Sequence, residues 1–299
     1  MRAVAAAALL AFAGFAGPAL AGIPVEEEMT CPVGGESFTH TTTASYSTYG
    51  ARPDGKPYGS WVFPMPLPEC PGNRLVLYKQ FDDAEIETLS ELVGSDAYRA
   101  MEGETDYYRA QWLEDRLSDT VPMPWLLMRA TWQVDGDPDR RRRYLGEFAD
   151  RAASVAVDRG DFGTMMLRFR LANAQRELGA LDRAAGTLAE LAEGLDPAAA
   201  DNADEAENLL WFGYMIDDLS AVVAAGDTSI EPLAMLPVDI VKGLCAGERK
   251  GEAGCRTGKR SRIEAQRRAE ADKLHAQKDK AQPDADSEDV MEVEAEILS

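Results

Sequence analysis

The spacing of apolar and polar residues divides this chain into two parts. From Ile23 to Phe81, short runs rich in threonine and aromatic residues alternate with turns rich in glycine and proline, which is typical of short strands. After Phe81, apolar residues recur at helical spacing, and glycine, aspartate or proline separates the runs. The pattern predicts a mainly α protein, in which a small β-rich module bounded by cysteines precedes a series of helices.

Helical spacing predicts a series of helices with short connections, near residues 83–101, 104–117, 122–134, 138–158, 161–179, 181–194, 202–224 and 230–244. Because the connections are short, we expect consecutive helices to pack as antiparallel hairpins. The predicted core consists of large apolar residues on these helices: Trp112, Trp125, Trp132, Phe148, Phe169, Leu171, Leu188, Leu191, Trp211, Phe212 and Tyr214.

Two β-type runs, residues 60–63 and 74–81, are expected to form strands in the β-rich module. Residues 64–73 separate them and hold four prolines in ten positions, which predicts an irregular loop because proline lacks a backbone N–H. The sequence therefore predicts a β-rich module over residues 22–82 and a helical domain over residues 83–255.

Residues 1–21 have the composition of a secretory signal peptide. Arg2 precedes an apolar run, Pro18 ends that run, and Ala19-Leu20-Ala21 supplies the small residues that a signal peptidase requires. We expect cleavage after Ala21 and a mature protein in the periplasm or outside the cell.

Residues 256–299 nearly lack core-forming side chains. Residues 256–282 hold nine lysines and arginines against four acids, and residues 284–299 hold seven acids and no base. Such a segment buries too little apolar surface to offset its conformational entropy, so the sequence predicts a charged, disordered tail with transient helix through residues 261–281.

The overall charge is strongly acidic. The chain has 52 aspartates and glutamates against 31 lysines and arginines, which gives a net charge of -21. This charge repels nucleic acid. The best candidate for a membrane span, residues 209–225, contains Asp217 and Asp218, so no span is predicted in the mature chain.

Four cysteines in an exported chain indicate disulfides. Three pairings are possible, and we favour Cys31–Cys70 and Cys245–Cys255 because each pair lies within one local segment. Four free structural thiols are the alternative, which export disfavours.

Residues 165–197 have the pattern of one tetratricopeptide-like unit. Small residues at Ala172 and Ala184 would let two helices approach closely, while Leu171 and Leu188 would fill the space between them. Gly179 ends the first helix. An ordinary helical hairpin explains the same stretch about as well.

The amino-terminal cysteines carry a second pattern. Cys31-Pro32-Val33-Gly34-Gly35 and Cys70-Pro71-Gly72-Asn73 resemble the two knuckles of an uncharacterised bacterial family that has an amino-terminal zinc ribbon followed by tetratricopeptide-like helices. Knuckles of that family read Cys-Pro-x-Cys-Gly, so the second cysteine of each is replaced here, by Gly34 and Asn73. Structural zinc requires four ligands. The resemblance therefore implies a zinc ribbon in which a Cys31–Cys70 disulfide has replaced the metal.

No catalytic, cofactor-binding or metal-binding residues are predicted. His40 lies on an expected strand and His275 in the expected tail, and no nucleophile motif accompanies either. Asp217 and Asp218 are neighbours in sequence, which does not place two carboxylates across a cleft.

Residues 135–139 resemble a calcium loop only superficially, because Arg140 stands where such a loop needs glycine. Asp137 is instead expected to cap a helix that begins at Pro138. Residues 140–143 are four arginines, which either bind an acidic partner or form a solvated helix face paired with nearby acids.

The sequence favours an exported, non-catalytic binding or scaffold protein that presents a helical-repeat groove to a protein or peptide partner. An extracytoplasmic carboxylate-based hydrolase is the first alternative. A metal-handling protein that uses Cys31, Cys70 and His40 is the second.

Overall fold

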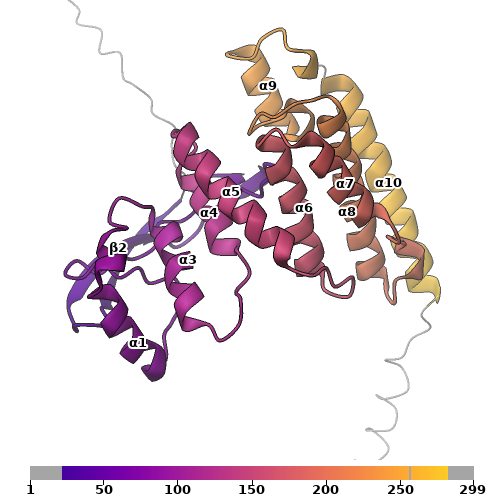
Figure 1. Cartoon of the computed structure of the whole chain (residues 1–299). Helices are drawn as coiled ribbons and strands as arrows, with labels where there is room; N and C mark the ends of the chain where they lie inside the picture. Colours follow the sequence, from indigo (N-terminus) through magenta and orange to yellow (C-terminus); the bar gives the residue numbers. More distant parts are fainter. Residues whose placement is uncertain (1–21, 256, 282–299) are drawn as a thin grey trace, which may run out of the picture.

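The computed structural model describes residues 22–255 and 257–281 (Figure 1). Over this part of the chain the protein is mainly helical, with two small antiparallel sheets near the amino terminus. The expected fold class is confirmed. The expected signal peptide and residues 282–299 lie outside the described residues.

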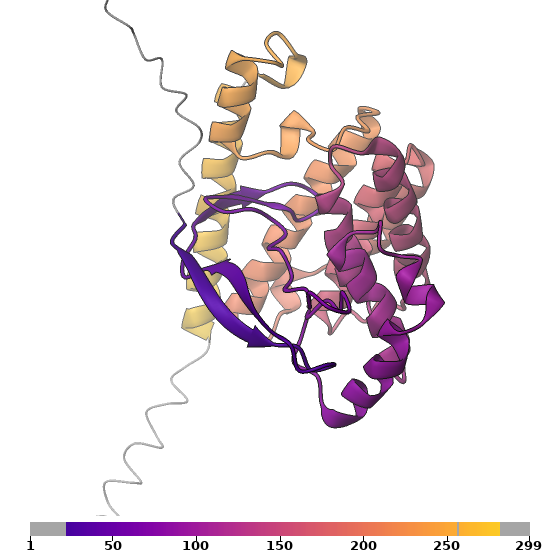
Figure 2. The same cartoon turned by 90° about the vertical axis from the view of Figure 1, so that its left-hand side faces the viewer.

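Two hairpins form the β structure. Strand β1 (Pro24–Thr30) pairs with β2 (Ser37–Thr43), and β3 (Thr48–Ala51) pairs with β4 (Pro57–Gly59). The β1–β2 ribbon lies at the edge of the molecule (Figure 2).

The two strands expected at residues 60–63 and 74–81 do not form. Apart from one bridge between Glu69 and Val76, these residues run as turns and loops. Leu75 and Val76 are fully buried against the disulfide and the first helices. The apolar run at 74–81 therefore reflects packing rather than strand pairing.

Ten α-helices are present in the described residues: α1 (Asp83–Val93), α2 (Asp96–Arg99), α3 (Asp106–Leu117), α4 (Trp125–Gln133), α5 (Pro138–Ser154), α6 (Phe162–Glu177), α7 (Leu181–Ala192), α8 (Ala203–Ala224), α9 (Val238–Ala246) and α10 (Thr257–Ala281). Side-chain caps fix several of the starts. Asp82 forms a capping box with Glu85, and Asp137, Asp161 and Asn202 each accept a backbone N–H in the first turn that follows.

Two expected helices are interrupted. The helix expected at 83–101 divides into α1 and α2 because Ser95 caps a new start after Gly94. The helix expected at 230–244 is replaced by a short 3-10 turn and α9, with Pro237 directly before α9.

Helices α3 to α8 pack in chain order, and α10 lies beside α8 (Figure 1). Three buried clusters run through the stack: one around the first disulfide and α1, one across α3 to α6, and one across α6 to α8. Of the predicted core residues, Trp132, Phe148, Phe169, Leu171, Leu188, Leu191 and Phe212 are buried, while Trp112, Trp125, Trp211 and Tyr214 are half-buried.

Residues 257–281 differ from the expected disordered tail. They form α10, which runs antiparallel to α8 and is held mainly by polar contacts, such as the ion pair between Arg267 and Asp218. A polar helix of this kind covers the end of a helical stack, where one face meets solvent. Composition alone did not reveal it because its partners are charged residues elsewhere in the chain.

No helix in residues 22–255 or 257–281 is long and apolar enough to cross a membrane.

Candidate functional site

The β3–β4 turn reaches into the helical domain and forms an ionic network there. Arg52 donates to Asp54 (2.6 Å) and to Asp135 (2.8 Å). Arg141 of α5 donates to Asp54 (3.2 Å), Asp135 (2.8 Å) and Glu177 of α6 (2.8 Å). Arg52, Asp54 and Arg141 are all more than nine-tenths buried. The network therefore joins the β-rich module to α5 and α6 through desolvated charges.

Burial and charge act on the acids of this network in opposite directions. Burial alone would raise the pKa of Asp54, but the charges and hydrogen bonds of Arg52 and Arg141 outweigh it and lower that pKa. Burial raises the pKa of Glu177, and the charge of Arg141 offsets only part of this effect. Asp54 is therefore the stably ionised acid of the two.

Arg170 of α6 lies beneath the turn. Its guanidinium donates to the carbonyl of Pro53, and burial lowers its pKa to about 10. Gly55 has a φ of +90°, and a Cβ there would come within 3.1 Å of the Arg170 Nη2 atom. Only glycine fits this position without strain or displacement.

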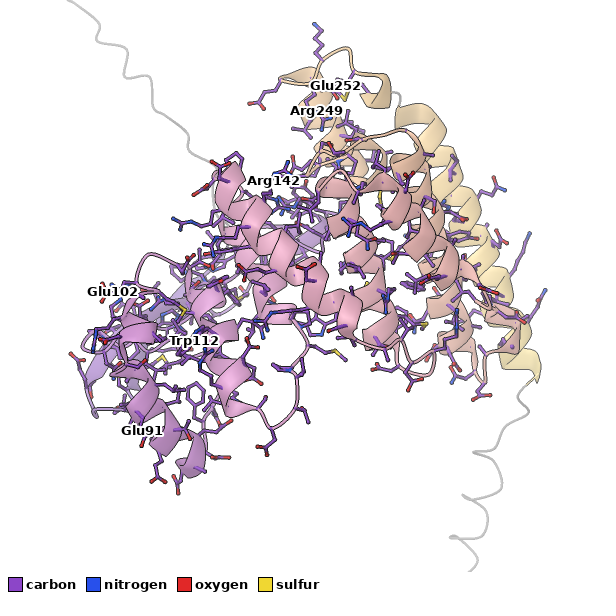
Figure 3. The ribbon with its side chains drawn as sticks, in the orientation of Figure 1. Glu91, Glu102, Trp112, Arg142, Arg249 and Glu252 are labelled. Atoms are coloured by element: carbon purple, nitrogen blue, oxygen red, sulfur yellow. A yellow bond between two sulfur atoms is a disulfide. The ribbon has the colours of Figure 1, made fainter. Side chains whose placement is uncertain are left out.

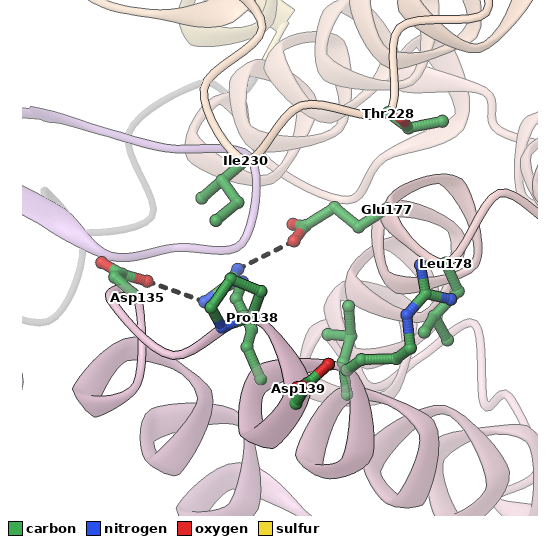
Figure 4. A pocket seen from close by; sticks show the side chains of 10 residues that line it. Asp135, Pro138, Asp139, Glu177, Leu178, Thr228 and Ile230 are labelled. Carbon is green, nitrogen blue, oxygen red and sulfur yellow. Dashed lines mark hydrogen bonds and ion pairs between the residues drawn. The ribbon is translucent and has the colours of Figure 1, made fainter.

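A polar cleft of about 330 Å³ opens above the network, between α5, the end of α6 and the segment that follows α8. Figure 4 shows Asp135 and Glu177 on opposite sides of it, each joined to the guanidinium between them, which belongs to Arg141. Arg142, near the amino-terminal end of α5, also lines the cleft (Figure 3). Arg141 therefore binds both Asp135 and Glu177. The two acids hold this arginine in place and do not form an acid–base pair directed at a substrate.

The four consecutive arginines do not share one surface. Arg140 donates to the carbonyl of Gly103, Arg141 is buried, and Arg142 lines the cleft. Arg143 pairs with Glu104 (2.7 Å). Sequence reasoning placed all four on an exposed face and missed the burial of Arg141.

The other sequence-level candidates are dispersed. Asp137 caps α5, as expected, by accepting from the Arg140 N–H (3.1 Å). His40 stands opposite Glu27 in the β1–β2 ribbon, and His275 lies 3.4 Å from Asp204. Among the described residues, no group of three or more histidines, cysteines and acids is placed to hold a metal ion.

Both expected disulfides are present. Cys31–Cys70 is buried in the core of the β-rich module, and Cys245–Cys255 is half-exposed and closes the loop between α9 and α10. Within that loop, Arg249 pairs with Glu252 (2.6 Å; Figure 3).

The two turns that begin at Cys31 and Cys70 have the same backbone hydrogen bonds. Each cysteine N–H donates to the carbonyl five residues on, and each cysteine carbonyl accepts from the N–H four residues on, over 2.8 to 3.1 Å. The fourth residue after each cysteine has a positive φ, +70° at Gly35 and +63° at Arg74. Arg74 is the one non-glycine residue with positive φ in the described chain.

Gly34 and Asn73 occupy the third position after each cysteine, and they face each other. A Cβ on Gly34 would lie 4.0 Å from the Asn73 Nδ2 atom, which itself donates to the Val33 carbonyl (2.8 Å). An amide hydrogen bond thus ties the two turns together beside the disulfide. The positive φ of Gly34, +98°, is specific to the first turn.

Helices α6 and α7 form the hairpin that was expected to be tetratricopeptide-like. Ala172 and Ala184 are fully buried where the two helices meet, and Gly179 ends the first helix with a φ of +81°. Arg176 of α6 is fully buried and donates to the carbonyls of Asp227 and Ser229.

An apolar groove runs between α7 and α8. It consists of two hollows of about 240 Å³ each, which share Ala192, Ile216 and Asp217. Its walls include Ala185, Leu188, Ala189 and Ala192 of α7 and Leu209, Gly213, Tyr214, Ile216, Asp217 and Ser220 of α8. The small residues on both walls leave room for the backbone of another segment to approach closely.

The rim of the apolar groove is acidic. Asp217 is exposed in its wall, and Asp182 and Glu193, also exposed, lie one helical turn from the lining alanines of α7. The groove therefore combines an apolar floor with negative charge at its edges.

Comparison with protein-family models, with curated proteins and with solved structures gives no match to this chain.

Proposed function

We propose that this protein is an exported binding protein, without catalytic activity of its own, that takes up a basic amphipathic segment of a partner protein in the apolar groove between α7 and α8. The observation that carries the proposal is the groove itself, an open apolar surface walled by alanine and glycine and rimmed by exposed acids. An amphipathic helix binds such a groove through its apolar face, and basic residues beside that face complement the acids.

Export is the second part of the proposal. It rests on the signal-peptide composition of residues 1–21 and on two disulfides, which persist in oxidising compartments. Expression of the whole chain with its own leader should yield a periplasmic protein that begins at Gly22, as read by mass spectrometry of the mature amino terminus. A cytoplasmic product that retains residues 1–21 would contradict export.

The β-rich module has a scaffold role in this proposal. We infer that its two cysteine turns descend from zinc knuckles and that the Cys31–Cys70 disulfide has taken over the cross-link that zinc gives in the family they resemble. The matching hydrogen bonds of the two turns support this inference.

Site-specific photocrosslinking tests the binding function. A photoreactive residue at Ala189, which is exposed in the apolar groove, should capture one protein in the periplasm of the source cell. The same residue at Glu87, exposed on α1, is the control. The captured peptide should be basic and amphipathic, and Asp217→Lys should weaken its capture.

Equal capture at both positions, or no capture at position 189, would contradict the proposed groove. The hydrolase alternative has less support because two of the three acids that line the polar cleft, Asp135 and Glu177, are bound to Arg141.

A further inference from the structure

Helix α10 is docked on α8 by polar contacts rather than by an apolar seam. Ala271 is the one fully buried side chain among those that the structure describes on α10. By comparison, α6 has nine buried residues. Ion pairs and hydrogen bonds at partly exposed positions are weakened by salt and contribute little individually, so raised salt should loosen the docking of α10.

Arg267 makes two of the described contacts of α10, beside those of Glu270, His275 and Lys278. The Arg267 Nη1 and Nη2 atoms donate to the two carboxylate oxygens of Asp218, at 2.6 and 2.8 Å. The same guanidinium lies over the ring of Tyr214, 4.6 Å from its centroid. Arginine, unlike lysine, has a planar guanidinium that can donate to both oxygens of a carboxylate and also stack on an aromatic ring.

Asp218 and Tyr214, which contact Arg267, both belong to α8 and lie one helical turn apart. Trp211 packs edge-on against the Tyr214 ring, with 5.5 Å between the ring centroids, and the Tyr214 hydroxyl donates to Glu270 of α10 (2.7 Å). Asp218 and Tyr214 therefore form an arginine socket, fixed by the helix that carries them rather than by α10.

The arginine socket adjoins the apolar groove. Tyr214 lines the groove and also contacts α10. Asp217, in the groove wall, directly precedes Asp218. A segment bound in the groove thus comes beside the socket that Arg267 occupies.

Two glycines give the backbone before α10 some freedom to turn. Gly247 and Gly251 lie in the short loop between α9 and α10, and Gly251 has a φ of +94°, whereas Gly254 packs closely against Leu233. The Cys245–Cys255 disulfide keeps the start of α10 close to α9. A displaced α10 would therefore stay attached at its first residues.

We propose that Asp218 and Tyr214 are an arginine-binding site for the partner segment, and that Arg267 of α10 occupies this site as an internal competitor in the free protein. The identity of the partner as a basic segment rests on the proposed function, whereas the competition between α10 and an added segment does not. A partner arginine gains access when α10 leaves α8.

Binding of a labelled synthetic peptide of residues 257–281 to the full mature chain tests this proposal. Arg267→Ala in the chain loosens the internal competitor while leaving the socket intact. This variant should bind the peptide about tenfold more tightly than the unaltered chain. Binding should weaken as NaCl is raised from 50 to 500 mM, and a peptide carrying Arg267→Lys should bind less well.

Adding Asp218→Asn to the Arg267→Ala chain removes the carboxylate and should abolish the gain. Hydrogen exchange of α6 and α7 amides in each variant confirms that the fold is kept. Equal peptide affinity of the unaltered and Arg267→Ala chains, or binding unaffected by Asp218→Asn, would overturn the arginine site. Either result would leave the crosslinking test at position 189 unchanged, so the two proposals fail separately.

Discussion

Arg141 shows how a charged residue becomes buried when its partners come from three separate segments. Its guanidinium contacts Asp54 from the β3–β4 turn, Asp135 from the turn between α4 and α5, and Glu177 from α6. Removing one member of a buried ionic group leaves the remaining charges desolvated and incompletely paired, which costs more than the pair contributes net. The network is therefore expected to govern how the β-rich module stays attached.

Asp54→Asn should lower the free energy of unfolding by about 3–5 kcal/mol, because it removes the buried carboxylate between Arg52 and Arg141 and leaves the partly exposed Asp135 as the acid that binds both. Urea denaturation measures this loss. Asp139→Asn, an exposed acid beside the same cleft, is the matched control and should change stability by less than about 0.5 kcal/mol. Equal effects of the two variants would contradict a stabilising network.

The same variant should show a defined pH dependence. The pKa of Asp54 is lowered on folding from its ordinary value of 3.8, so its ionised form stabilises the native state above that pH and the stabilisation is lost as pH falls through the folded pKa. The difference in unfolding free energy between the unaltered chain and Asp54→Asn should be constant above about pH 5 and shrink below 3.8. A difference that grows on acidification would contradict the ionised state of Asp54.

Gly55→Ala should destabilise the protein more than Gly226→Ala does. Both glycines have positive φ, +90° and +70°, but only Gly55 has a side chain, that of Arg170, within 4 Å of the added Cβ. The strain of a left-handed alanine costs about 1 kcal/mol at either site, and displacement of the buried guanidinium adds to it at Gly55. Thermal unfolding of both variants gives the comparison. Equal decreases in Tm would show that the Arg170 side chain moves aside at no cost in stability.

At the scale of elements, local sequence signals located most of the helices. Asp82, Asp137, Asp161 and Asn202 mark starts that the structure reproduces, because an N-cap acts within one turn. Local signals gave the wrong secondary structure where contacts between residues far apart in the chain determine it. Residues 74–81 have strand composition but pack as a loop, and residues 257–281 have tail composition but dock on α8.

The two disulfides should differ in their effect on stability. Cys31 and Cys70 are 39 residues apart, whereas Cys245 and Cys255 are 10 apart. Loop entropy predicts a loss of about 4 kcal/mol for Cys31→Ser with Cys70→Ser and about 2.7 kcal/mol for the second pair. Urea denaturation of both double variants tests the order, and hydrogen exchange should show the second loss confined to the region around α9 and α10.

At the scale of the whole molecule, the chain has a net charge of -21. The apolar groove has exposed acids at its edges. The basic helix α10 already lies against acidic α8. If the protein binds a partner as proposed, its charge would favour a basic partner segment and the groove would favour an apolar face on that segment.

A helical peptide of lysine and leucine should therefore bind the mature protein more tightly than a glutamate and leucine peptide with the same apolar face. Isothermal titration in 50 and 500 mM NaCl measures both. The ratio of affinities should fall toward one at high salt because the rim charges are screened, and Asp217→Asn should reduce it at low salt. Equal affinities at low salt would contradict charge selection.

The sequence by itself determined the fold class, the order of the helices and both disulfide pairings. Hydrophobic periodicity, helix caps and cysteine spacing are all local features of the chain. It also fixed the acidic charge. Only the tertiary structure decided that Arg52, Asp54, Arg141 and Glu177 form one buried network, that α7 and α8 leave an open groove, and that α10 covers α8. These features join residues far apart in the chain, and the free energy of a buried charge depends on partners that no local pattern specifies.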